Sequence, residues 1–257
     1  MAENFANDYG TTLDGAINDT DAALTLASAT GAPSAPFRVR IENELILVGA
    51  RTTTACSSLT RGAEGTTAAS HATGSAITHV LTAAGLESIR PAGKLYLSAA
   101  GGWPSTTAGC AVNTKTEMAT NKENYYTLDF DTTTQEYAEW TVAMPSDWNA
   151  STVTAVFYWM HPATTTNFGV TWALAGYSFG NDDTGDAAFG TLQDVDDTGG
   201  TTSDIYISGA TAAITIGGSP AASELVQFRA TRVVGDAADN MAVDAKLLGV
   251  MVTYGRA

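Results

Sequence analysis

The stretch from Val153 to Tyr177 is the most concentrated block of β-branched and aromatic residues in the chain. Its first half alternates with the period of two that a strand imposes, so two sets of side chains face opposite ways. Val153, Ala155, Phe157 and Trp159 form one set, and Thr154, Val156, Tyr158 and Met160 form the other. Because both sets are largely apolar, such a strand needs cover on both faces. The block predicts two core strands of a β-sandwich or of a subunit interface.

The composition also favours an all-β protein. Only 15% of the 257 residues are charged, and small neutral residues are abundant. A chain of this length forms one large or two ordinary domains and can bury a core without disulfides or metals. Cys56 and Cys110 lie far apart in sequence, and we expect two reduced thiols rather than a bridge, because we expect the chain to fold in a cytosol.

The net charge of −15 and pI near 4.3 disfavour nucleic acid and anionic lipid as partners. Membrane insertion is not expected either. Met1 is not followed by a basic and then an apolar segment, and no apolar run approaches the roughly 20 residues that span a bilayer.

The charges are unevenly distributed along the sequence. The interval from Glu123 to Phe228 has no Lys or Arg but holds 14 of the 27 acidic residues, whereas Met1 to Lys122 has eight basic and ten acidic residues. Burying an unpaired carboxylate is costly. We therefore expect the base-free interval to face solvent, at the end of the molecule away from any particle to which it attaches.

Turn signals and alternation predict a β-module over residues 1–90 and a jelly-roll-like β-sandwich over residues 91–257. In the module we expect residues 1–10 to be an arm ordered only by a partner, Thr11–Ser28 to form a hairpin, and strands to flank the Glu42-Asn43-Glu44 turn.

Eight strands are predicted in the sandwich: Tyr125–Phe130, Glu139–Met144, Val153–Met160, Gly169–Tyr177, Asp204–Ser208, Ala212–Ile216, Glu224–Val234 and Met241–Tyr254. The last two flank a Gly- and Asp-containing loop and are expected to form a hairpin.

The module contains PFRVRIENELILVGA and LTRGAEGTTAASHATGSAITHVLTAAGL, with a TRG-x-x-GTTAA-x-H core from Thr60 to His71. Over about 75 residues it resembles a module that recurs in structural proteins of tailed bacteriophages. The C-terminal region, from FYWMHPATTTNFGVTWALAGYSF to LLGVMVTY, is also similar to a domain of phage fibre or surface proteins.

This resemblance implies a non-enzymatic virion component, usually a homotrimer, assembled in the host cytoplasm. The N-terminal module would dock on capsid, portal or tail proteins, and the C-terminal domain would point outward. A tail fibre, a head fibre and a capsid decoration (cement) protein all remain open.

No motif predicts catalytic residues or a cofactor site. Seven aspartates lie between Asp182 and Asp204, where a divalent cation could bind, but the spacing is not that of an EF-hand and a solvated acidic loop is the simpler interpretation. His71, His79 and His161 lack metal-ligand spacing. The Gly199-Gly200 and Gly217-Gly218 pairs lack the features of a phosphate-binding loop.

Two further sets of residues leave a function in carbohydrate recognition open. The carboxylate pairs Glu136/Glu139 and Asp129/Asp131 could serve glycoside hydrolysis, although such pairs are usually only solubilising. Aromatic side chains could stack on sugars but are expected mainly in the core: Trp103, Trp140, Trp148, Trp159, Trp172 and Tyr158. A shallow aromatic cleft or a close carboxylate pair would favour a protein that recognises host-surface carbohydrate.

Overall fold

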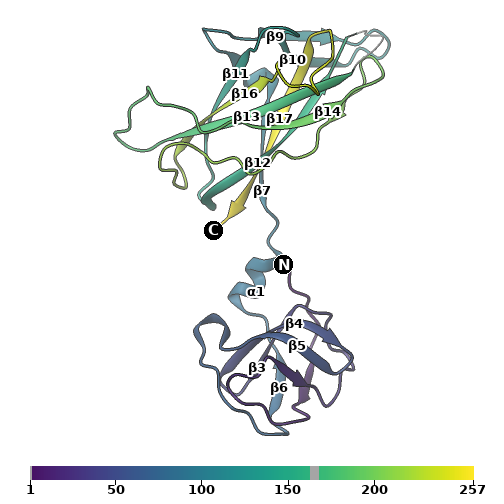
Figure 1. Cartoon of the computed structure of the whole chain (residues 1–257), viewed down its shortest axis with the longest axis vertical. Helices are drawn as coiled ribbons and strands as arrows, with labels where there is room; N and C mark the ends of the chain where they lie inside the picture. Colours follow the sequence, from purple (N-terminus) through teal and green to yellow (C-terminus); the bar gives the residue numbers. More distant parts are fainter. Residues whose placement is uncertain (1, 163–167) are drawn as a thin grey trace. The chain divides into compact units, whose positions relative to one another are not determined.

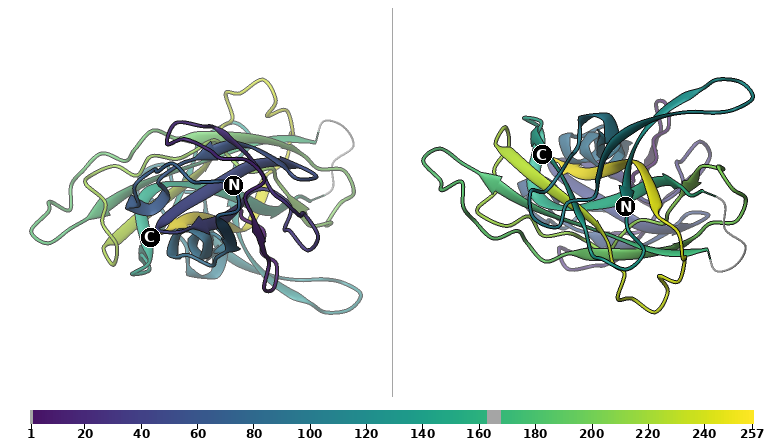
Figure 2. Two further views of the ribbon diagram at one scale, coloured as in Figure 1. Left: turned by 90° about the horizontal axis from the view of Figure 1, so that it is seen from below. Right: turned by 90° about the horizontal axis from the view of Figure 1, so that it is seen from above.

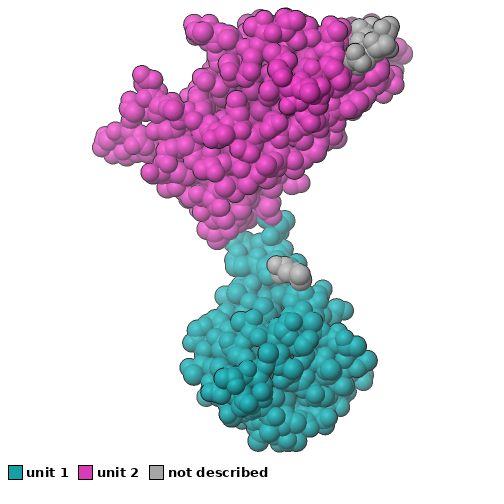
Figure 3. Space-filling view, in the orientation of Figure 1, with its two compact units in different colours: residues 1–91 teal, residues 92–257 magenta. Residues whose placement is uncertain are grey.

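The computed structural model describes residues 2–162 and 168–257. Strands account for 47% of the chain and helices for 5%, which confirms the all-β prediction. The chain divides into two compact units, Met1–Pro91 and Ala92–Ala257, called here the N-terminal unit and the C-terminal unit (Figures 1 and 3). In the described ranges no helix has the length and apolar character needed to cross a membrane.

The N-terminal unit is one curled six-stranded sheet in the order β1-β6-β3-β4-β5-β2. Its elements are β1 Gly10–Thr12, β2 Ala23–Thr25, β3 Phe37–Ile41, β4 Glu44–Thr52, β5 Ala55–Thr60, η1 Ala63–Gly65, β6 Ala76–His79 and α1 Ala83–Ile89. The chain after β1 meets the chain after β2 through a bridge between Leu13 and Leu26. Because the two edges meet there, the sheet closes on itself and presents little open edge to other chains.

Alternation places the core of the N-terminal unit correctly. Phe37, Val39 and Ile41 are fully buried, and β3 pairs with β4 across the predicted turn. The predicted hairpin over Thr11–Ser28 is confirmed in part, because its two halves meet in the antiparallel bridge between Leu13 and Leu26. The strands β1 and β2 themselves pair with β6 and β5 rather than with each other.

The prediction of an N-terminal arm ordered only by a partner is wrong. Tyr9 is 4% exposed in the core, and the buried Glu3 forms a 2.8 Å ion pair with Arg38. The helix α1 was not predicted; its first turn is capped by Thr82, whose side chain accepts a hydrogen bond from the Gly85 amide.

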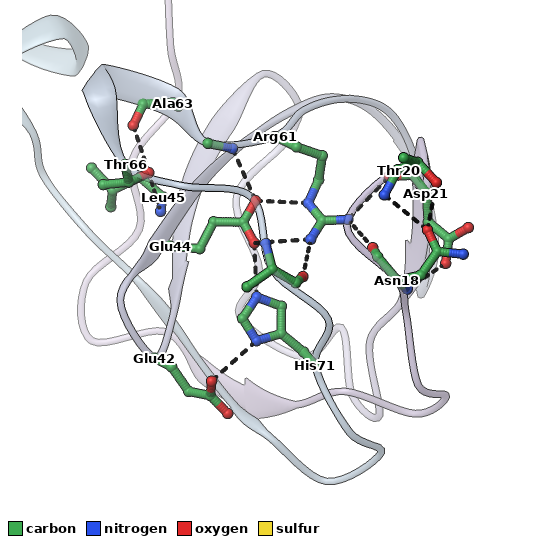
Figure 4. A network of polar contacts seen from close by, with 12 residues as sticks. Asn18, Thr20, Asp21, Glu42, Glu44, Leu45, Arg61, Ala63, Thr66 and His71 are labelled. Carbon is green, nitrogen blue, oxygen red and sulfur yellow. Dashed lines mark hydrogen bonds and ion pairs between the residues drawn. The ribbon is translucent and has the colours of Figure 1, made fainter.

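A buried ionic network holds the turns of the N-terminal unit together (Figure 4). The carboxylate of Glu44, 1% exposed, accepts two hydrogen bonds from Arg61, at 2.7 and 2.8 Å, and lies 2.8 Å from Nε2 of His71. The amides of Gly62 and Ala69 also donate to it. Arg61 and His71 are the TRG arginine and the final histidine of the phage-like motif, so these motif residues meet on one carboxylate.

These contacts set the ionisation of Glu44. Burial alone would raise the pKa of Glu44, but the hydrogen bonds from Arg61, Gly62, His71 and Ala69 outweigh it and lower the pKa from 4.5 to about 2. The carboxylate is therefore ionised at all ordinary pH values, and it compensates the buried guanidinium.

The C-terminal unit is a sandwich of two antiparallel sheets (Figures 1 and 2). The first sheet has the order β15-β12-β17-β10-β9, with β7 also on β17, and the second has the order β14-β13-β16-β11-β8. The strands are β7 Gly93–Ser98, β8 Trp103–Pro104, β9 Ala111–Glu117, β10 Asn124–Phe130, β11 Tyr137–Ala143, β12 Trp148–Met160, β13 Gly169–Phe179, β14 Gln193–Thr198, β15 Tyr206–Ile207, β16 Leu225–Arg232 and β17 Ala245–Arg256, with η2 at Ala99–Gly101. The chain passes repeatedly from one sheet to the other, as in a jelly roll.

The apolar block from Val153 to Tyr177 forms the centre of this sandwich. On β12, Phe157 and Trp159 are fully buried against β13 of the opposite sheet. The rings of Phe157 and Trp172 are stacked, with centroids 5.7 Å apart and planes 13° apart. The other face of β12, which carries Val156 and Tyr158, is only partly buried. The strand therefore has a core face and a second face that remains accessible.

The predicted hairpin of the last two strands is wrong, because β16 lies in the second sheet and β17 in the first. The connection between them is tied down by Arg232, which is fully buried. Its guanidinium donates to both oxygens of Asp239 and to the carbonyls of Met241 and Val243. These hydrogen bonds fix the connection from β16 to β17 as it passes from the second sheet to the first.

The expectation that the base-free interval lies wholly in solvent is also wrong. Glu139 is 7% exposed and pairs at 2.6 Å with Arg229 on the neighbouring strand β16. Asp129 pairs with Lys246 on β17 at 2.8 Å. Cations outside the interval in sequence reach it through strand pairing.

Substituting Glu44→Gln should destabilise the N-terminal unit by about 3–5 kcal/mol, because it leaves Arg61 buried without its anion. Since the folded pKa of Glu44 lies below 4.5, its contribution in the parent chain is present above pH 4.5 and lost as the pH falls toward 2. Hydrogen exchange of the backbone amides of the N-terminal unit, followed at several pH values, would measure both the loss of stability and its pH dependence. Glu42→Gln is the control, because the Glu42 side chain is 63% exposed and touches the network only through Nδ1 of His71, at 3.4 Å. Equal losses in the two variants would contradict this account.

Candidate functional site

A shallow groove lies on the first sheet of the C-terminal unit. Its volume is about 300 Å³, and we call it the tyrosine groove. It is lined by Tyr96, Ser98, Ala100, Asn124, Tyr125, Tyr126, Tyr158, Ile205 and Leu248. These residues come from β7, η2, β10, β12 and β17 and from the chain just before β15, so only the folded sheet brings them together.

Tyr96 is placed by the backbone beneath it. On β17, opposite the end of β7, Gly249 has no side chain, and a Cβ there would lie 2.5 Å from the Tyr96 hydroxyl oxygen. The register between β12 and β17 shifts at Leu248, and the Tyr96 hydroxyl donates to the Leu248 carbonyl at 3.1 Å. The ring therefore lies across the sheet over a glycine while half of its surface, 50%, stays exposed.

The side chain of Tyr158 lies beside the Tyr96 ring. The rings of Tyr96 and Tyr158 meet edge to face, with centroids 5.8 Å apart and an interplanar angle of 84°. Burial and then the neighbouring Tyr158 raise the pKa of Tyr96, so its hydroxyl remains a neutral donor to the Leu248 carbonyl. Two rings that meet nearly at right angles beside the groove form a corner into which a cyclic ligand can fit.

The rest of the lining is uncharged. Tyr126 is 47% exposed on β10, and Ile205 is 47% exposed on the β15 side. Within the described residues, no hydrogen bond engages the hydroxyls of Tyr125, Tyr126 or Tyr158. The groove thus combines aromatic surface with hydroxyl groups that are free to bond a ligand.

The outer face of the second sheet differs. There Phe189, from the connection between β13 and β14, lies over Arg229, with the guanidinium carbon 4.0 Å from the ring centroid. Ala173 and Ala175 of β13 are buried. Among the described aromatic residues of this unit, Tyr96 and Tyr126 of the first sheet are 50% and 47% exposed, and Trp103 on β8 of the second sheet is 44% exposed.

The acidic stretch Asp182–Asp204 is not a single loop, because Gln193–Thr198 forms the edge strand β14. Asp194, Asp196 and Asp236 bring carboxylate oxygens within 4.8 Å of one another. Asp196 already accepts a bond from the Thr171 hydroxyl. These are largely exposed groups, and the solvated acidic segment stays the prediction for this stretch.

The three histidines lie apart and have separate roles. His71 belongs to the Glu44 network, and His79 lies on β6 of the same unit. His161 is 1% exposed in the C-terminal unit, with Nδ1 2.8 Å from the Pro162 carbonyl, and it accepts a bond from the Gly200 amide at Nε2. These two contacts fit the tautomer in which Nδ1 donates and Nε2 accepts.

The carboxylate pairs are engaged in structural bonds. Glu139 accepts bonds from Ser105, Gln227 and Arg229, and Glu136 accepts the Asp131 amide. Four tryptophans are buried, Trp140, Trp148, Trp159 and Trp172, whereas Trp103 is 44% exposed.

The two cysteines and the glycine pairs are structural as well. Cys56 and Cys110 are buried free thiols in separate units. Gly199 makes room for the His161 ring, and Gly217 packs against Gly190.

Sequence reasoning singled out only Tyr158 of the groove residues. Tyr96, Tyr125 and Tyr126 were not predicted as site residues. The signal available was the alternation in Lys94–Ser98, which places Tyr96 on the opposite face from Leu95 and Leu97. Nothing local shows that this face meets Tyr158.

No protein-family model matches the chain. No curated protein matches it. Among solved structures, a xylan-binding module, CBM15, is 13% identical, with 64% of this chain and 98% of that chain covered and a TM-score of 0.37. The CBM22-1–CBM22-2 tandem domain of Paenibacillus barcinonensis Xyn10C is 10% identical, with 98% and 76% covered and a TM-score of 0.38.

A module specific for non-crystalline cellulose, CBM28, is 12% identical, with 61% of this chain and 85% of that chain covered and a TM-score of 0.33. These structural neighbours are carbohydrate-binding modules. With identities and scores this low, the likeness carries no argument about what this chain binds.

Substituting Gly249→Ala should destabilise the C-terminal unit by about 1–3 kcal/mol, the usual cost of an overpacked site. The added Cβ would lie 2.5 Å from the Tyr96 hydroxyl oxygen and 2.6 Å from the Leu97 carbonyl oxygen, so both Tyr96 and the β7 backbone must shift. Tryptophan fluorescence during urea unfolding would measure this loss, since all five tryptophans lie in this unit. Gly185→Ala is the control, because nothing lies within 4 Å of a Cβ at that position. Equal stability of the two variants would show that Tyr96 does not depend on Gly249.

Proposed function

We propose that this protein is a non-enzymatic carbohydrate-binding protein of a tailed-bacteriophage particle. Its C-terminal unit binds a glycan in the tyrosine groove, and its N-terminal unit attaches it to the virion. The observation that carries the proposal is Tyr96, which is 50% exposed and whose ring meets that of Tyr158 edge to face at the groove.

The chemistry of this corner suits a sugar ring. The face of an aromatic ring is electron-rich, so it attracts the weakly positive C–H groups on the flat side of a pyranose. The edges of the sugar carry hydroxyls, which need hydrogen-bond partners when water is displaced. The hydroxyls of Tyr125, Tyr126 and Tyr158 provide such partners at the groove, and so does the side-chain oxygen of Asn124, whose nitrogen already donates to the Lys122 carbonyl.

Two other ligands fit less well. A single-stranded nucleic acid also stacks on aromatic rings, but its phosphates require cations, and the groove lining has none. A proline-rich peptide binds in a groove between aromatic side chains, whereas the rings of Tyr96 and Tyr158 meet edge to face at 84°. Binding rather than hydrolysis is favoured because none of the described residues that line the groove carries a carboxylate.

Attachment to a virion is supported by the phage-like motif. Its Arg61 and His71 converge on Glu44, so the resemblance extends to residues that build the N-terminal unit. The partners would be capsid, portal or tail proteins and two further copies of this chain in a homotrimer. A head or tail fibre is the main assignment, and a cement protein of the head lattice is the alternative.

Substituting Tyr96→Ala should weaken glycan binding at least tenfold, a loss of about 1.4 kcal/mol, because the stacking surface disappears. Tyr96→Phe should retain most of the affinity, since the ring remains. A glycan array followed by calorimetry on the best ligand would test this. Leu225→Ala, a change at a 48% exposed residue of the opposite sheet, is the control. Binding that is unchanged in Tyr96→Ala would disprove the assignment of the site.

Deleting residues 1–90 should abolish incorporation into phage particles while the C-terminal unit stays folded and oligomeric. The two units have separate cores, so the loss of one leaves the other packed. Quantitative mass spectrometry of purified particles would measure occupancy, and sedimentation would measure the oligomeric state. Normal occupancy of the truncated chain would refute docking through the N-terminal unit, and a monomer would refute the trimer.

A further inference from the structure

The charge of the tyrosine groove points to a more specific ligand. We infer that the groove selects uncharged glycans and discriminates against those bearing carboxylate, sulfate or phosphate groups. This inference rests on the proposed function. It concerns which class of sugar is bound.

The first observation is the absence of cations from the described lining of the groove. All nine lining residues are uncharged, although the chain carries 39 charged residues in total, 12 basic and 27 acidic. An acidic sugar would give up its hydration without gaining an ion pair. Its anion would also meet the electron-rich faces of Tyr96 and Tyr158, which favour cations.

The second observation is the balance of charge around the groove. Glu123 and Asp204 directly precede the lining residues Asn124 and Ile205. Against these two acidic residues, Lys94 lies two residues before Tyr96, and Lys115 on β9 lies opposite Tyr126. The Lys246 ammonium, two residues before Leu248, is paired with Asp129 at 2.8 Å, and the Lys122 ammonium, two residues before Asn124, is paired with Glu117 at 3.5 Å. The rim therefore offers no excess of positive charge to offset the net charge of −15 on the chain.

The test is an array on which each acidic bacterial glycan is printed beside its carboxyl-reduced counterpart, in which the carboxylate is a primary alcohol. The full chain and Tyr96→Ala are compared at 50 and 500 mM NaCl. We expect Tyr96-dependent binding to neutral and reduced members, at least tenfold weaker binding to the acidic partners, and less than a twofold change with salt.

A variant with an added charge makes the test reciprocal. Ile205→Lys should raise the affinity for acidic members at least fivefold at 50 mM NaCl and lose that gain at 500 mM. Leu225→Lys is the matched control on the opposite sheet and should show no gain.

The two ideas fail in different ways. Tyr96-dependent binding that requires the carboxylate, and is lost on reduction, would overturn the inference of neutral ligands and leave the proposed function standing. An absence of Tyr96-dependent binding to every glycan would overturn the proposed function and this inference together.

Discussion

The folded chain depends on matching each deeply buried carboxylate with an arginine. Glu44 pairs with Arg61 in the N-terminal unit. In the C-terminal unit Asp239 pairs with the fully buried Arg232 at 2.7 Å. A chain in which acidic residues outnumber basic ones by 27 to 12 can bury few carboxylates safely. Its arginines therefore lie where turns and connections must be fixed, and the remaining acidic groups are mostly left to solvent.

Local patterns predicted much of the fold. Alternation identified β3, β4, β12 and β13 and the buried faces of β3 and β12, because a strand with a core face imposes a period of two on its sequence. Pairing partners are not encoded in such short windows. The predicted hairpin of β16 and β17 failed because loop composition cannot distinguish a tight turn from a connection between sheets, and the contact of Arg232 with Asp239 that decides it is tertiary.

The candidate site was less predictable than the fold. Tyr96, Tyr126 and Tyr158 lie on three strands that are separated by up to 62 positions, and a single strand shows only that one tyrosine leaves the core face. The Glu139 carboxylate gives a parallel case: its cation, Arg229, lies 90 positions away and becomes a neighbour only through the pairing of β11 with β16. Charge counts along a sequence therefore misjudge which carboxylates are exposed.

The position of the groove follows from how the two sheets use their outer faces. The second sheet is partly covered by its own connection, with Phe189 over Arg229, so that sheet gains stability at the expense of accessible surface. The first sheet keeps Tyr96 half exposed, supported by a backbone carbonyl and by the space above Gly249. An exposed aromatic ring that is fixed in orientation loses little conformational freedom when a ligand stacks on it, which favours binding. The feature that stabilises Tyr96 in the free protein is thus the same feature that prepares it for a ligand.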